Sequence, residues 1–235
     1  MSAYYNLGFK ELGMSQVVRF AGALALSLAS VFAWSQDVVE PTLSAHQVVE
    51  MTTTDVMAVI DAAQEYVDES PETYYLAVHE VLDPIIDFRG FARSVMGPYA
   101  SSDQYRSLDE AGRQQLRAQL ERFTEVMRLG LVTTYSKGLL AFAGSAIELE
   151  KPESDAEVQS RVSVRQIIHN DTPEPYVVMY QMGLNKAKQW KLRNVIIENV
   201  NLGEIYKTQF EAAARQHDGD LDAVISNWAS AEVEG

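Results

Sequence analysis

The sequence predicts an α+β fold in which helices come first, four antiparallel strands form a curved sheet, and two further helices close the chain. Apolar residues recur every three or four positions from about residue 43 to residue 142, as on the buried face of a helix. After Gly144 the period changes to the alternation typical of strands. The connections between these strands are short and rich in turn residues, which favours an antiparallel meander with helices packed on one face.

The helices are predicted from apolar spacing together with caps and breakers. In chain order they are an amphipathic helix over about 43–68, a helix from Pro71 to about Val81 behind a Ser70 cap, a helix capped by Asp87 and ended by Gly97-Pro98, a long helical region from about Leu116 to Phe142, and two final helices over about 203–216 and 219–229. An internal glycine costs ~1 kcal/mol relative to alanine, so a bend or break is expected near Gly130.

The four predicted strands cover residues 146–150, 157–168, 176–184 and 189–200. Tyr176–Met182 (YVVMYQM) and Val195-Ile196-Ile197 are apolar on both faces, whereas a sheet with one face in water alternates cleanly. One interpretation is an ordinary core with helices on both faces. The other is an internal apolar cavity, and several methionines fit a surface that adapts to flexible chains, although methionine more often fills a core.

The beginning of the chain resembles an export signal. Residues 20–32 form an uncharged apolar run behind Arg19, and Val31-Phe32-Ala33 offers a cleavage pattern, so we expect residues 1–33 to be a signal peptide and 34–235 a single exported domain. Met14 lies close ahead of Arg19 and is an alternative start. The run is shorter than the ~20 residues that span a bilayer, so the mature protein is expected to be soluble, with an uncleaved anchor as the alternative.

Composition excludes several function classes. The chain carries a net charge of −14, and removing residues 1–33 takes away Lys10, Glu11 and Arg19, so the mature value is −14 minus (+1), or −15. Such an acidic protein disfavours nucleic acid and anionic bilayers as partners. The absence of cysteine excludes disulfides, thiol catalysis and cysteine-ligated metals.

Several segments together resemble one family. Asp87–Tyr99 (DFRGFARSVMGPY) is similar to the DFxxMAxxVLGxxW segment of the MlaC family, also called the toluene-tolerance Ttg2 family. The resemblance continues, in order, through a helix with Leu116, Phe123, Tyr135 and Leu139, a hairpin with Tyr180-Gln181-Met182 and Gln189-Trp190-Lys191-Leu192, and Ile205–Phe210 (IYKTQF). It departs from the family pattern at Tyr99 (usually Trp), Asn194 (commonly Asp) and Asn199-Val200-Asn201 (commonly Gly-Val-Ser).

This resemblance implies a periplasmic phospholipid-binding shuttle with an NTF2-like fold, which moves phospholipid between the outer and inner membranes and maintains outer-membrane lipid asymmetry. Phospholipid is then cargo and no cofactor is expected. The implied partners are an outer-membrane MlaA-like lipoprotein with a porin and an inner-membrane MlaD-like MCE protein of an ABC transporter complex. The alternatives are an NTF2-like protein-interaction module without lipid and, less favoured, an exported hydrolase.

Two sets of site residues follow. The expected lining of the lipid cavity is Phe123, Met127 and Tyr135 on a helix, with Val162, Val164, Tyr180, Met182, Val195 and Ile197 on strands. A β-bulge near Asn194 would change which strand face points inward. Arg161 and Arg165 share the outward face of one strand and are candidate contacts for acidic partner loops, the alternative being a solvated strand face.

No residue pattern indicates an enzyme or a metal site. The sequence has no HExxH or GxSxG motif, and His79, Glu80 and Asp83 fit a solvated helix end. The run of Asp218, Asp220 and Asp222 resembles a calcium loop, but it lacks the required glycine and the glutamate at the twelfth position.

Overall fold

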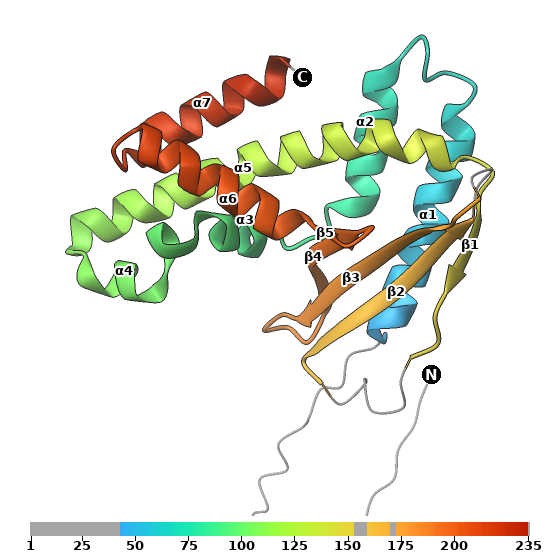
Figure 1. Cartoon of the computed structure of the whole chain (residues 1–235), viewed down its shortest axis with the longest axis horizontal. Helices are drawn as coiled ribbons and strands as arrows, with labels where there is room; N and C mark the ends of the chain where they lie inside the picture. Colours follow the sequence, from blue (N-terminus) through green and yellow to red (C-terminus); the bar gives the residue numbers. More distant parts are fainter. Residues whose placement is uncertain (1–42, 153–158, 170–172, 235) are drawn as a thin grey trace, which may run out of the picture. The chain divides into compact units, whose positions relative to one another are not determined.

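The computed structural model describes residues 43–152, 159–169 and 173–234, all within one compact unit. The predicted signal segment and the start of the predicted 157–168 strand therefore lie outside the described residues. In chain order the elements are α1 (Ala45–Ala63), α2 (Pro71–Leu82), α3 (Phe88–Met96), α4 (Ser102–Ser107), α5 (Glu110–Leu139), β1 (Ala146–Leu149), β2 (Arg161–His169), β3 (Tyr176–Leu184), β4 (Trp190–Ile197), β5 (Val200–Asn201), α6 (Leu202–Gln216) and α7 (Leu221–Glu234) (Figure 1). This order confirms the α+β prediction.

Helix starts follow local side-chain chemistry. Ser44 and Gln47 form a reciprocal capping box at α1, and the Asp87 carboxylate accepts from the Gly90 N–H at 3.0 Å, as predicted for α3. Pro71 begins α2 as expected, but the Ser70 side chain makes no cap hydrogen bond. The short helix α4 was not predicted from the sequence.

Helix α5 runs unbroken through Gly130, so the expected break there is wrong. Gly130 is buried, and its cost in the helix is outweighed by packing along most of α5. Phe123 of α5 contacts Phe210 and Trp228, with ring centroids 4.9 and 5.5 Å apart. These contacts tie α5 to α6 and α7, which run alongside it (Figure 1).

The sheet is an antiparallel meander in the order β1-β2-β3-β4-β5. It has five strands, so the prediction of four is wrong. The chain reverses direction within the predicted last strand, 189–200. Glu198 and Asn199 have φ angles of 48° and 66° and form a two-residue hairpin turn, so that Ile197 pairs with Val200. Asparagine tolerates this left-handed conformation better than most residues, which accounts for Asn199 at a position where the family pattern has glycine.

The core divides into three groups of apolar side chains. One joins α3, α5, α6 and α7, and a second joins α1, α2 and the start of α3 to the later part of α5. The third lies between α1 and one face of the sheet, around Val164, Met182 and Trp190. Helix α1 belongs to both the second and third groups and thus connects the helical layer to the sheet.

Candidate functional site

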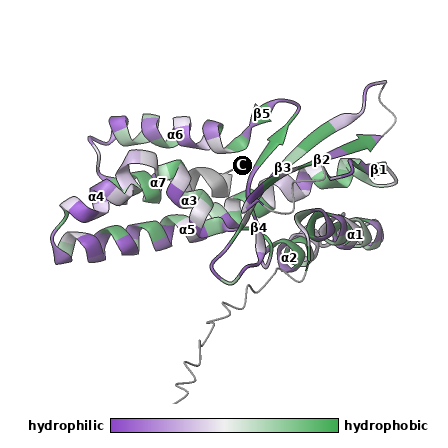
Figure 2. Ribbon diagram, turned by 90° about the horizontal axis from the view of Figure 1, so that it is seen from below, coloured by the Kyte–Doolittle hydropathy of each residue, from purple (hydrophilic) through white to green (hydrophobic). Residues whose placement is uncertain are grey.

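The six strand residues predicted to line a cavity share one face of the sheet, which we call the apolar face. Val162 lies opposite Met182, Val164 opposite Tyr180, and Tyr180 opposite Val195. Residues directly opposite one another in a sheet point to the same side, and Ile197 follows Val195 by two positions. In Figure 2 the strands carry both hydrophobic and hydrophilic colours, as expected for a sheet with one apolar and one polar face.

A β-bulge in β4 makes this common face possible. The register shifts so that Gln181 lies opposite Asn194 while Met182 lies opposite Leu192, which leaves Arg193 as the extra residue. Without it, Leu192 and Val195 would point to opposite faces, because they are an odd number of positions apart. The structure therefore contains a bulge beside Asn194, at the point where a bulge changes which face of β4 points inward.

Helix α1 covers part of the apolar face. Val164 is 0% exposed and Met182 is 2% exposed, both packed against Ala45, Val48 and Val49 of α1. Val162 and Tyr180 are only partly buried in the same cluster, and Val195 and Ile197 are partly buried outside it. The apolar face is thus sealed at its centre and less closely packed around it.

Tyr180 lies next to a polar chain that the sequence did not predict. Its hydroxyl donates to Gln166 Oε1 at 2.7 Å, and Gln166 Nε2 donates to Thr53 Oγ1 of α1 at 2.8 Å. Gln166 is 2% exposed on a strand face that is otherwise apolar. The only sequence signal was a glutamine at a position of β2 where the alternation calls for an apolar residue.

Tyr180 also has an unusual environment. Burial raises the pKa of its phenol. The side chain is partly buried and packs against the cluster formed by α1 and the sheet, at the border of the part of the apolar face that α1 covers.

The three helical residues predicted to line the cavity lie in two different places. Phe123 and Met127 are 0% and 1% exposed and pack among α3, α6 and α7, so the structure does not bring them to the sheet. Tyr135 is partly buried and lies one helical turn from Leu131 and Leu139, both of which pack against the α1–α2 cluster.

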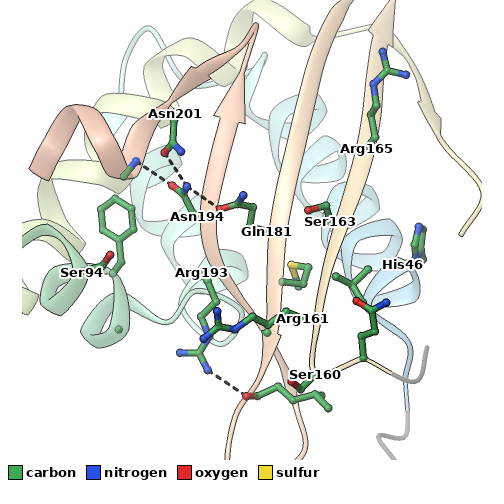
Figure 3. A pocket seen from close by; sticks show the side chains of 18 of the residues that line it. His46, Ser94, Ser160, Arg161, Ser163, Arg165, Gln181, Arg193, Asn194 and Asn201 are labelled. Carbon is green, nitrogen blue, oxygen red and sulfur yellow. Dashed lines mark hydrogen bonds between the residues drawn. The ribbon is translucent and has the colours of Figure 1, made fainter. Parts of the chain in front are cut away.

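The opposite face of the sheet, which we call the arginine face, is hollowed into a groove. The groove has a volume of about 1080 Å³ and is bounded by strands β2 to β4, by α3 and by the first residues of α6 (Figure 3). Arg161 and Arg165, the predicted docking residues, both line it. Asn194 organises its inner wall, because Nδ2 donates to Gln181 at 2.9 Å and to Asn201 at 2.8 Å, while Oδ1 accepts from the Gly203 N–H at 2.9 Å.

Asp83 and Asp220, which were considered for catalysis and for calcium binding, have structural partners. Asp83 pairs with Arg128, and its nearest contact with His79 is 3.8 Å. Asp220 accepts from the backbone of Asp222 at 3.0 Å, at the start of α7. Within the described ranges, no group of three or more metal-ligating side chains gathers, and no helix is long and apolar enough to cross a membrane.

These features define an α+β protein whose sheet presents an apolar face to helix α1 and a groove lined by arginines on the other side. Residues 50–230 match the MlaC protein family. The chain is 29% identical over 184 residues to the toluene tolerance protein ttg2D of Pseudomonas putida, covering 78% of this chain and 79% of that one. Its fold is similar to that of a phospholipid-binding protein from Ralstonia solanacearum, solved in complex with a phospholipid, with a TM-score of 0.67, 19% identity and coverage of 82% and 98% of the two chains. The chain belongs to the MlaC family.

Proposed function

We propose that this protein binds phospholipid, with the acyl tails against the apolar face of the sheet and the headgroup toward solvent. The observation that carries the proposal is the apolar face of the sheet, which α1 buries at Val164 and Met182 and leaves partly exposed at Val195 and Ile197. Membership of the MlaC family and the likeness to a phospholipid-binding protein support it. The proposed wall consists of Val162, Val164, Tyr180, Met182, Val195 and Ile197, with Tyr135 from α5.

The physics of such a site requires no catalytic group. Each buried CH₂ contributes ~0.8 kcal/mol, so two long tails supply ample affinity through apolar contact alone. The same affinity makes spontaneous release slow. We therefore propose a carrier, not an enzyme, which gives up or receives lipid when a partner favours an open state.

The proposed setting is the periplasm. The apolar run behind Arg19 fits an exported protein. By family membership, the proposed partners are an MlaA-like lipoprotein with a porin at the outer membrane and an MlaD-like MCE protein at the inner membrane. Movement of phospholipid between these two partners would maintain outer-membrane lipid asymmetry.

Native mass spectrometry of the mature protein, purified without detergent, tests the proposal. We expect phospholipid in roughly stoichiometric amount. A protein that is lipid-free after gentle purification, and that takes up no phospholipid from vesicles, would overturn the proposal and favour an interaction module.

A matched pair of variants locates the tails. Val164→Glu places a carboxylate on the apolar face, at a cost of several kcal/mol, whereas Ser163→Glu places the same group on the exposed side of the same strand. We expect Val164→Glu to lose lipid and Ser163→Glu to keep it. Val195→Glu, at a partly buried position, serves if Val164→Glu does not fold. Full lipid occupancy in a folded Val195→Glu protein would exclude this face as the wall.

A further inference from the structure

The three central strands have a charge opposite to that of the whole chain. The chain contains 33 Asp and Glu residues against 19 Lys and Arg residues. Strands β2, β3 and β4 and the turn between β3 and β4 contain no Asp or Glu at all. Their basic residues are Arg161, Arg165, Lys186, Lys188, Lys191 and Arg193.

Two of these arginines meet over a glycine on the arginine face. Arg161 lies directly opposite Gly183, and the Arg193 side chain rests on the same glycine, because a Cβ placed there would lie 3.1 Å from Arg193 Nε. The bulge at Arg193 and the missing side chain at Gly183 therefore bring the two side chains together (Figure 3). Burial lowers the pKa of Arg193, in keeping with its position against the wall of the groove.

Ion pairing distinguishes the arginines of the groove. Arg193 pairs with Asp87, the cap of α3, and Arg165 pairs with Glu150. Among the described residues, no carboxylate pairs with Arg161, which is exposed. The exposed hydroxyl of Ser163 lies two positions along the same strand. Arg161 is thus a cation available to a ligand, beside a neutral hydrogen-bond donor.

We propose that this groove is the docking site for an acidic segment of a partner protein, with Arg161 as the principal contact. The proposal rests on the proposed function, because the partner is one that delivers or receives the lipid. An anionic bilayer is a poorer match. A bilayer is broad enough to face the whole surface of a chain with net charge −14. A single acidic segment meets only the groove, where Lys151, Arg161, Arg165 and Arg193 outnumber Glu150 and Glu204. Arg161 lies on the strand face opposite to Val162, although Val162 and Met182 of the apolar face also border the groove.

A fluorescein-labelled octaglutamate peptide serves as the probe, with binding followed by fluorescence anisotropy at low ionic strength. We expect Arg161→Glu to weaken binding about fivefold or more, and the difference to shrink as salt is added. The matched control is Lys186→Glu, which makes the same charge change at an exposed residue outside the groove. We expect it to weaken binding less than about twofold.

Three outcomes overturn the docking site: no binding of the peptide to the wild-type protein, equal weakening by the two variants, or binding of phosphatidylglycerol vesicles that depends on Arg161. Lipid content, measured in parallel, separates this proposal from the one above. Phospholipid retained by Arg161→Glu together with weakened peptide binding supports both proposals. A wild-type protein without phospholipid that still binds the peptide through Arg161 overturns only the lipid function.

Discussion

Replacing Gln166 by leucine breaks the polar chain between α1 and the sheet at its central member. Gln166 accepts from the Tyr180 hydroxyl at 2.7 Å and donates to Thr53 Oγ1 at 2.8 Å. Leucine has a similar size but offers neither group. The variant therefore removes both hydrogen bonds and leaves an enclosed tyrosine hydroxyl without its acceptor.

The cost can be estimated from these contacts. Each hydrogen bond contributes ~0.5–1.5 kcal/mol net, and a buried hydroxyl without a partner costs ~1–3 kcal/mol. The added apolar surface of leucine offsets part of this loss, so we expect Gln166→Leu to lower the free energy of unfolding by ~2 kcal/mol. In a Tyr180→Phe background no tyrosine hydroxyl remains, and the same change should cost less than ~1 kcal/mol.

Urea unfolding of the delipidated protein measures this difference as a double-mutant cycle. Lipid is removed because a ligand that binds only the folded state adds to apparent stability. Gln114→Leu, at an exposed glutamine of α5, is the control and should change stability by less than ~0.5 kcal/mol. Equal costs of Gln166→Leu in the wild-type and Tyr180→Phe backgrounds would refute the inferred coupling between Gln166 and Tyr180.

Three further predictions concern stability. Asn194→Asp removes the amide group that donates to Asn201, whose own side chain caps α6, and should lower the free energy of unfolding in urea by ~1–2 kcal/mol. Adding Asn201→Ser should recover much of this loss, because a serine hydroxyl both donates to the new carboxylate and caps the helix. No recovery in the double variant would contradict the role assigned to the Asn194–Asn201 hydrogen bond. Burial, with smaller effects of neighbouring tyrosines, raises the pKa of Tyr74 from 10.0 to about 12. The stabilising contribution of this raised pKa is therefore complete below pH 10 and is lost as the pH rises toward 12. Tyr74→Phe should remove this alkaline loss of stability in unfolding curves measured over a series of pH values. Hydrogen bonds, first from Gln119, lower the pKa of Asp222. Its contribution to stability is therefore present above the pKa of the unfolded state and is lost as the pH falls through the pKa of the folded state. Asp222→Asn should lower the free energy of unfolding by less than ~1 kcal/mol at neutral pH, and a loss that persisted in acid would contradict an origin in the charged carboxylate.

Much of the fold was predictable because its signals are local. Caps and breakers depend on neighbouring residues, so Asp87 indicated the start of α3 and Pro71 the start of α2. Alternation placed Val162, Val164, Tyr180 and the other wall residues on one face of the sheet, since a strand's side chains alternate whatever packs against them. From the sequence, a bulge near Asn194 was only a condition that would decide which face points inward; the structure has a bulge there, and it aligns the two ends of β4.

The errors arise where local signals compete with the turn or the packing. The extra strand depends on left-handed conformations at Glu198 and Asn199, which a segment without glycine or proline does not reveal. Gly130 does not interrupt α5, because packing along a long helix outweighs the ~1 kcal/mol preference of one residue. The intrinsic preference of a residue is a weak guide when many contacts act together.

The sequence by itself determined the class of fold, the ends of most helices, the common face of the strand residues and the family. Only the tertiary structure decided what each apolar or charged side chain meets. Periodicity shows that Phe123 is buried but not that its partners are Phe210 and Trp228, because those contacts join residues far apart in the chain. For the same reason, the polar chain through Gln166 and the ion pairs that leave Arg161 available depend on distances between separate elements, which a one-dimensional pattern does not contain.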